Sequence, residues 1–162
     1  MSTNTPSAAP VLRFDVPPRV ALVVSRFNEE VTGGLRTGAL EWLAEHGIGV
    51  RDSDIIAAPG AYELPLIAQA LARTERYQGV ICLGCVIKGD TAHFEFISLG
   101  AATGLMQASL ATGVPVAFGV LTTYTDAQAI ARSRPDIHNK GREAAAACVE
   151  SIAILAAIAR DE

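Results

Sequence analysis

The sequence has little of what several protein classes require. Charged residues are only 19% of its 162 residues and the net charge is −4, so the basic surface that nucleic-acid binding needs is missing. No apolar run reaches the roughly 18 residues that indicate a membrane-spanning helix. Residues 1–10 have neither a basic start nor an apolar stretch, so we expect no secretory signal. We expect a cytoplasmic protein with a disordered arm at residues 1–10.

Cysteine is also scarce, with three residues at positions 82, 85 and 148. Cys82 and Cys85 have the C-x-x-C spacing of some metal and redox sites. Both lie in a predicted strand, however, and residues i and i+3 of a strand point to opposite faces. We therefore expect buried, apolar thiols in a reducing compartment, and no metal site.

Apolar residues, in contrast, are abundant. They make up 50% of the chain, and the mean hydropathy of +0.30 is high for a monomer. The excess apolar surface indicates contacts between subunits, so we expect a homo-oligomer. The length is that of one domain, which we place at residues 11–162.

Strands and helices alternate along the sequence. Apolar and β-branched runs predict four strands, at residues 19–25, 50–58, 78–86 and 115–121. Helical spacing of apolar residues and capping residues predict five helices, at residues 29–46, 62–76, 91–111, 125–134 and 139–160. This order predicts an α/β fold, a three-layer sandwich with a four-stranded parallel sheet in the middle. Residues 11–16, before Pro17 and Pro18, predict an arm strand added to this sheet or to that of a neighbouring subunit.

One predicted helix contains two adjacent glycines. Gly33 and Gly34 lie within residues 29–46, where each glycine costs roughly 1 kcal/mol relative to alanine. The pair indicates either a close approach of another segment or a loose first turn.

The carboxyl ends of parallel strands meet at one edge of a sheet, which is where such sheets bind ligands. This rule brings together residues 26–28, 59–63, 86–93 and 118–124. Residues 84–93 combine a turn at Gly89 with the start of a helix, whose free N–H groups bind anions. His93 follows within the first turn, and its side chain suits proton transfer near neutral pH. The edge thus predicts an anion site beside an acid–base group.

Several side chains at this edge have two interpretations. Phe27 can stack on a planar heterocycle or anchor its loop to the core. Glu63 can bind ligand hydroxyls or favour the dipole of the helix that follows it. Arg132 and Lys140 suit a phosphate and a carbonyl oxygen, or else lie on a solvated surface.

The motifs together resemble those of lumazine synthases, the enzymes that make 6,7-dimethyl-8-ribityllumazine for riboflavin. They run in the family's order from about residue 19 to the C-terminus. The matching stretches are Arg26-Phe27-Asn28, Pro59 to Pro65, Gly84 to Phe94, Phe118 to Thr122, Gln128-Ala129 with Arg132, and Asn139-Lys140-Gly141 with Glu143-Ala144-Ala145. The resemblance implies a flavodoxin-like fold and a transferase that joins 5-amino-6-(D-ribitylamino)uracil to 3,4-dihydroxy-2-butanone 4-phosphate.

The resemblance also implies the role of each site residue, with no cofactor and no metal. His93 is the general acid/base, Phe27 stacks on the uracil ring, and Phe118 closes the pocket from a neighbouring subunit. The pyrimidine and its ribityl chain are held by Ala61, Tyr62, Glu63, Cys85, Val86, Ile87 and Lys140. The phosphate site consists of Asp90, Thr91 and Arg132.

Family members assemble as pentamers or as sixty-subunit shells of pentamers, and riboflavin synthase is a further partner that the resemblance implies. The loop at residues 133–138 has no insertion, which favours the shell. This chain departs from the family pattern at Cys85, Ala131 and Leu99-Gly100, and in the sequence of that loop. Only the backbone of Cys85 is needed, whereas Leu99-Gly100 replaces a polar pair at a subunit contact.

Two other functions fit the same edge of the sheet. One is a flavin- or nucleotide-binding module without catalysis. The other is a shell-forming scaffold whose site has decayed, which the presence of His93, Arg132 and Lys140 disfavours.

Overall fold

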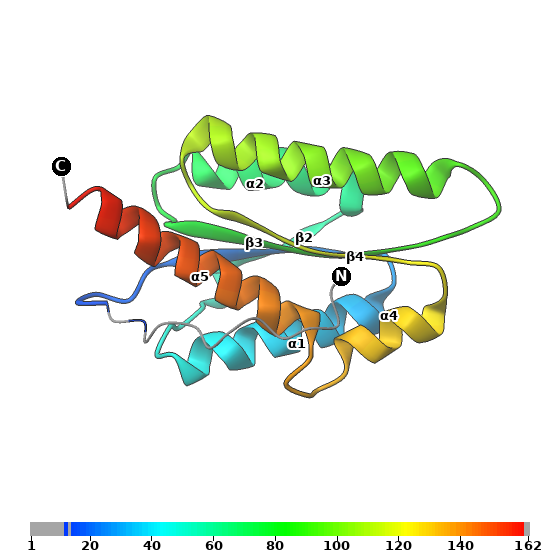
Figure 1. Cartoon of the computed structure of the whole chain (residues 1–162), viewed down its shortest axis with the longest axis horizontal. Coiled ribbons are helices and arrows are strands. Elements are labelled where there is room, and N and C mark those ends of the chain that lie inside the picture. Colours follow the sequence, from blue (N-terminus) through cyan, green and yellow to red (C-terminus); the bar gives the residue numbers. More distant parts are fainter. Residues whose placement is uncertain (1–11, 13, 161–162) are drawn as a thin grey trace.

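The computed structural model describes residues 12 and 14–160, and these form one sheet with helices on both faces (Figure 1). All neighbouring strands are parallel, in the order β2-β1-β3-β4. The strands are β1 (Val20–Ser25), β2 (Ile55–Ala58), β3 (Gly79–Ile87) and β4 (Val116–Thr123). The predicted four-stranded parallel sheet is confirmed.

Five α-helices cover the sheet, as predicted. They are α1 (Glu29–Glu45), α2 (Leu64–Ala72), α3 (His93–Thr112), α4 (Asp126–Ser133) and α5 (Lys140–Ile158). Helices α2 and α3 lie on one face, and α1, α4 and α5 lie on the other (Figure 1). This arrangement confirms the three-layer sandwich.

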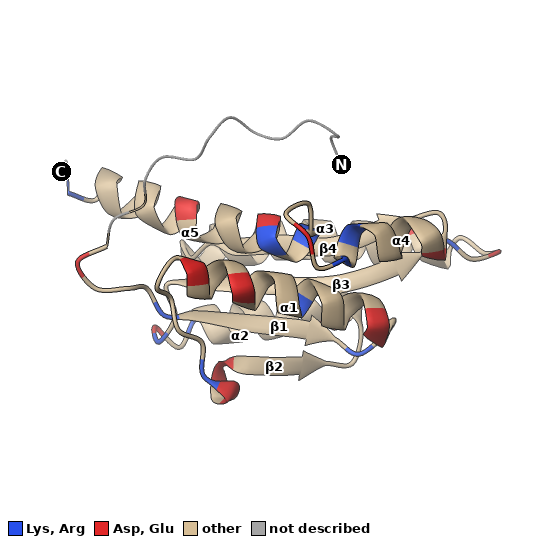
Figure 2. Ribbon diagram, turned by 90° about the horizontal axis from the view of Figure 1, so that it is seen from below, with Lys and Arg blue, Asp and Glu red and all other residues tan. Residues whose placement is uncertain are grey.

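The strands are apolar because both of their faces are covered. None of the four carries a charged residue, and the charged positions lie on the helices and loops around them (Figure 2). Successive side chains of β1 and β3 enter opposite core layers. Leu22 and Ile81 pack under α1 and α5, whereas Val23 and Val80 pack under α2 and α3.

The cysteines follow the same alternation, as predicted. Cys82 belongs to the core layer under α2 and α3, and Cys85 belongs to the opposite one. Burial raises the pKa of all three thiols, to about 11 for Cys85 and about 12 for Cys148. These free thiols are therefore protonated, apolar core side chains at neutral pH.

Two elements begin later than predicted because a 3₁₀ turn precedes each of them. Residues 52–54 form a 3₁₀ turn, so β2 begins at Ile55 rather than near residue 50. The turn places the Asp54 carboxylate against Arg19, which a straight strand would not do. A second 3₁₀ turn, Ala61–Glu63, delays the start of α2 to Leu64.

The predicted arm lies largely outside the described residues, which begin with Leu12 and continue from Phe14. The described part, residues 12 and 14–16, contains no strand. Leu12 and Phe14 instead pack, partly buried, against the core layer under α1 and α5. Within the described residues, neither edge strand of the sheet, β2 or β4, pairs with the arm. Its pairing with a neighbouring subunit stays a prediction.

Three side chains at the amino ends of the strands form a closed group, the Asp54 cluster of Arg19, Asp54 and Tyr77. Asp54 is 2% exposed and accepts hydrogen bonds from Arg19 Nε at 3.2 Å and from Arg19 Nη2 at 2.6 Å. The Tyr77 hydroxyl donates to the same carboxylate at 2.9 Å. The Arg19 guanidinium holds the pKa of Asp54 below its usual range.

Candidate functional site

A pocket of about 380 Å³ lies at the carboxyl ends of β1, β2 and β3; we call it the rim pocket. It brings together three of the four loops that the sequence placed at this edge. Its lining residues are Phe27, Asn28, Gly60, Ala61, Tyr62, Glu63, Cys85, Val86, Ile87, His93 and Ile97. Eight of the predicted site residues therefore share one cavity in a single chain.

Phe27 projects from the loop between β1 and α1. Its side chain is 68% exposed, so it does not anchor the loop to the core. Asn28 does this instead: it adopts a left-handed backbone conformation with φ 56°, and its Nδ2 donates to the carbonyl oxygen of Cys85 at 3.0 Å. The ring of Phe27 is thereby left open to a planar ligand at the mouth of the pocket.

The turn after β2 forms a second wall of the pocket. Gly60 has extended backbone, and a Cβ there would lie 2.9 Å from Glu63 Oε2 and 3.5 Å from the ring of Phe27. Glu63 occupies the N-cap position of α2 but makes no side-chain capping bond. Its carboxylate folds back over Gly60, into the space that a ligand hydroxyl would occupy.

The end of β3 forms the floor. Cys85, Val86 and Ile87 pair with β4, and their side chains go from buried to half-buried toward the rim. The strand continues into the loop at residues 88–92, which is fixed to β4 by the Lys88 N–H bond to the carbonyl oxygen of Thr123, at 2.9 Å. This bond places the start of α3 directly beside the pocket.

Helix α3 begins at His93, two residues later than predicted. Ala92, rather than Asp90 or Thr91, occupies the N-cap position and offers no side-chain acceptor. In the first turn, the His93 N–H makes only a long hydrogen bond, with 3.4 Å between its nitrogen and Thr91 Oγ1. The first-turn N–H groups thus stay available to an anion, and Asp90, Thr91 and His93 are exposed beside them.

Lys88 and Tyr124 fix the outer side of this loop. The Lys88 ammonium lies 3.4 Å from Glu95 Oε1 and 5.5 Å from the centroid of the Tyr124 ring. Phe94 packs against the same ring, with centroids 6.0 Å apart. The exposed Tyr124 therefore joins the β4–α4 corner to the start of α3.

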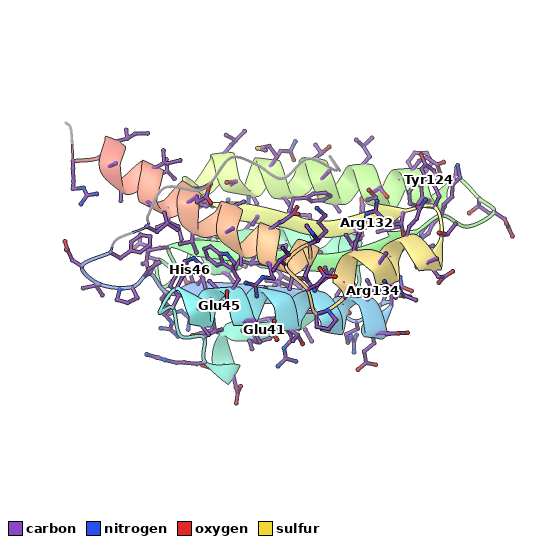
Figure 3. All side chains as sticks on the ribbon, turned by 60° about the horizontal axis from the view of Figure 1, so that its bottom comes forward. Glu41, Glu45, His46, Tyr124, Arg132 and Arg134 are labelled. Carbon is purple, nitrogen blue, oxygen red and sulfur yellow. The ribbon has the colours of Figure 1, made fainter. Side chains whose placement is uncertain are left out.

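Five predicted site residues do not line the rim pocket of their own chain. Asp90 and Thr91 lie in the adjoining loop, and the other three lie on β4, α4 and α5. Phe118 is on the edge strand β4, 46% exposed, and lines a separate groove of about 570 Å³ between α3 and α5. Arg132 is on α4, where its Nη1 donates to the carbonyl oxygen of Gln128 at 2.9 Å (Figure 3). Lys140 begins α5 and pairs with Glu143. One chain does not bring these side chains to His93.

Comparison with known proteins gives a single assignment. A family model described as 6,7-dimethyl-8-ribityllumazine synthase matches residues 17–156. The chain belongs to the 6,7-dimethyl-8-ribityllumazine synthase family. The family predicted from the rim motifs is thus confirmed.

Two curated proteins of the lumazine synthase family match most of the chain. The 6,7-dimethyl-8-ribityllumazine synthase 1 of Caulobacter vibrioides is 71% identical over 140 residues, 86% of this chain and 92% of its own length. The 6,7-dimethyl-8-ribityllumazine synthase of Salinibacter ruber is 50% identical over 137 residues, 85% of this chain and 88% of its own length. The residues that the family model matches, 17–156, include every predicted site residue.

The sequence did not single out two of the residues that line the rim pocket. Asn28 was quoted only as part of a motif, although its left-handed backbone is typical of asparagine and predicts a fixed turn. Ile97 follows His93 by one helical turn, and this spacing points it into the same pocket.

In the part of the chain described, no helix has the length and apolar character needed to cross a membrane.

Proposed function

We propose that this chain is a transferase of riboflavin biosynthesis that condenses 5-amino-6-(D-ribitylamino)uracil with 3,4-dihydroxy-2-butanone 4-phosphate to 6,7-dimethyl-8-ribityllumazine. The family match over residues 17–156 and the 71% identity to a curated synthase support the reaction. The observation that carries the proposal is the rim pocket itself. It places an exposed aromatic ring, free strand-end backbone and His93 around one cavity of about 380 Å³.

The pyrimidine substrate occupies the rim pocket in this proposal. Its uracil ring stacks on the exposed ring of Phe27, and the backbone of Cys85, Val86 and Ile87 forms hydrogen bonds with its polar edge. The ribityl chain extends along the turn formed by Ala61, Tyr62 and Glu63. The Glu63 carboxylate, free of any capping bond, accepts hydrogen bonds from ribityl hydroxyls.

The phosphorylated substrate lies at the start of α3. The uncapped N–H groups of the first turn and the Thr91 hydroxyl bind the phosphate, with the Asp90 carboxylate directed away from it. Arg132 supplies the matching positive charge, whereas Lys140 contributes to the pyrimidine half of the site. Both cations, like Phe118, lie away from the rim pocket of their own chain, so a neighbouring subunit supplies them.

The reaction proceeds through proton transfers and carbonyl additions. The 5-amino group condenses with the ketone to an imine and releases water. Loss of phosphate gives an enol that tautomerises, and the ribitylamino nitrogen then attacks the second carbonyl and closes the ring with loss of a second water. His93, exposed beside both half-sites, carries protons between these atoms. Much of the rate enhancement comes from holding the two substrates together.

A homo-oligomer completes this site, and we propose a pentamer that assembles further into a sixty-subunit shell. The support is an apolar groove at the open edge of β4, which contains Phe118. Large exposed apolar side chains line the same groove: Met106, Leu110, Ile154 and Leu155. Sedimentation velocity tests the proposal, because a stable monomer would leave the pocket without Phe118 and overturn it.

Mixing the purified protein with both substrates tests the function. We expect lumazine absorbance and free phosphate to rise together, one molecule of each per turnover. A rate no higher than that of the spontaneous reaction would refute the enzyme. Tight binding of the pyrimidine or of a flavin without turnover would then identify the alternative, a non-catalytic binding module.

A further inference from the structure

Asn139 is the polar side chain with the most hydrogen bonds in the interior under α1, α4 and α5. It is 1% exposed, and its Nδ2 lies 3.1 Å from the carbonyl oxygen of Gly34, 2.9 Å from that of Ser133 and 2.8 Å from that of Arg134. Its Oδ1 accepts the N–H of Gly141 at 2.8 Å. We call these five residues the Asn139 cluster.

Glycines make the cluster possible. A Cβ at Gly34 would collide with the backbone oxygen of Ser133, and one at Gly38 would collide with the Asn139 side chain. A Cβ at Gly141 would collide with the backbone of Leu35. The sequence left two explanations for Gly33-Gly34, a close approach of another segment or a loose first turn. At Gly34 the first explanation holds, because α1 there meets the corner between α4 and α5.

The two ends of this corner carry the two cations of the proposed site, one for the phosphate and one for the pyrimidine. Arg132 directly precedes Ser133, and Lys140 directly follows Asn139. Helix α4 has only 8 residues, too few to be stable alone, so its direction depends on contacts such as these. One buried amide thus ties the last turn of α4, the first turn of α5 and the middle of α1.

We propose that Asn139 is a positioning residue for Arg132 and so sets the affinity of the site for phosphate. The inference rests on the proposed function, in which Arg132 binds the phosphorylated substrate. Asn139 itself is buried and contacts no substrate. Its effect reaches the phosphate only through the orientation of α4 and the start of α5.

Two substitutions separate this role from simple stabilisation. Asn139→Ser keeps an oxygen suited to the N-cap of α5 but is too short to reach all three carbonyls. Asn139→Asp keeps the acceptor for Gly141 and loses the N–H donors. For whichever variants fold, we expect the KM for 3,4-dihydroxy-2-butanone 4-phosphate and the Kd for inorganic phosphate to rise about tenfold, a typical size for coupled neighbours. The KM for the pyrimidine should change by only about twofold, because most of its predicted contacts line the rim pocket, which contains no member of the cluster.

Asp54→Asn is the matched control. It also disrupts the hydrogen bonds of a buried polar side chain, by replacing the carboxylate with a neutral amide, but at the amino ends of the strands. We therefore expect it to lower stability without changing either KM. Adding Asn139→Ser to Arg132→Ala tests the coupling directly. The double variant should bind inorganic phosphate only slightly less well than Arg132→Ala alone, because the arginine that Asn139 positions is already gone.

Calorimetric titration with inorganic phosphate needs no turnover, so it distinguishes this inference from the function. A wild type that binds phosphate but makes no lumazine would refute the proposed function. The phosphate Kd values of the wild type and the Asn139 variants would then still test the inference. Asn139 variants that lose thermal stability as Asp54→Asn does, with unchanged phosphate Kd and KM, would overturn the inference. So would a wild type that binds no phosphate.

Discussion

The two ends of the sheet differ in what their polar side chains do. At the amino ends, the Asp54 cluster satisfies its charges within one chain, with Asp54 buried and bonded to both Arg19 and Tyr77. At the carboxyl ends, Phe27, His93 and the first turn of α3 are exposed, and α3 has no side-chain cap. The difference indicates that the amino end serves folding, whereas the carboxyl end is kept open for ligands.

The largest expected effect of a rim substitution is that of Arg132→Ala. If the arginine pairs with a desolvated phosphate, its loss weakens binding of the phosphorylated substrate by roughly 2–5 kcal/mol, about thirtyfold to several thousandfold. Steady-state kinetics and phosphate titration measure it. The control is Arg134→Ala, an exposed neighbour at the end of α4, which should leave both values unchanged (Figure 3). Wild-type affinity in Arg132→Ala would refute its phosphate role.

His93→Ala should slow turnover by about 10- to 1,000-fold, in the lower range of general acid–base effects. The two substrates remain aligned without the imidazole, so the KM values change little. Single-turnover measurements at saturating substrate follow the effect. His46→Ala, at the exposed end of α1, is the control. An unchanged rate in His93→Ala would remove this histidine from the chemistry and weaken the contrast between the two ends.

Asp54→Asn should affect stability alone. It leaves the guanidinium of Arg19 without its charged partner, and we expect the Tm to fall by roughly 3–10 °C. The kcat and both KM values stay at the wild-type level because the amino end contacts no ligand. A change in KM without loss of stability would contradict the assignment of this end to folding.

Acid should lower the thermal stability of the wild type for the same reason, because it protonates the Asp54 carboxylate. The pKa of Asp54 is lower in the folded chain than in the unfolded one, chiefly through its hydrogen bonds from Arg19. Its contribution to stability is therefore complete above the ordinary carboxyl pKa of about 4 and is lost as the pH falls through the folded value. Thermal melts of Asp54→Asn should show a shallower decline below about pH 4 than melts of the wild type.

The smallest effect is expected at Phe27. Because its ring is 68% exposed, Phe27→Ala should leave the Tm unchanged. Loss of stacking should raise the KM of the pyrimidine about 3- to 10-fold, and Phe27→Tyr should retain near-normal binding. A drop in Tm with unchanged pyrimidine binding would show that Phe27 is a structural anchor after all.

The strands and their parallel arrangement follow from the sequence because burial on both faces requires uninterrupted apolar runs such as residues 79–83. The start of β2 could not be predicted in this way, because the 3₁₀ turn Asp52–Asp54 bends toward Arg19, and Asp54 is 35 positions from Arg19 in the chain. The start of α3 was placed too early because Asp90 and Thr91 are capping types. The backbone instead places Ala92 at the N-cap.

The candidate site divides in the same way. Residues near strand ends, such as Phe27 and Glu63, were located at the rim because parallel strands end together. In the proposed assembly, Phe118, Arg132 and Lys140 reach His93 from a second subunit, and no pattern within one chain specifies that contact. The role of Asn139 depends on three backbone carbonyls from two segments, which only the folded corner brings together.

A crystal structure of the assembled protein with the pyrimidine substrate and inorganic phosphate tests the central claim most directly. The account predicts the uracil ring on Phe27, phosphate at the first turn of α3, and His93 between them. Phe118 and Arg132 should reach the ligands from a neighbouring subunit. Ligands bound away from the carboxyl ends of the strands, or a site completed within one chain, would contradict it.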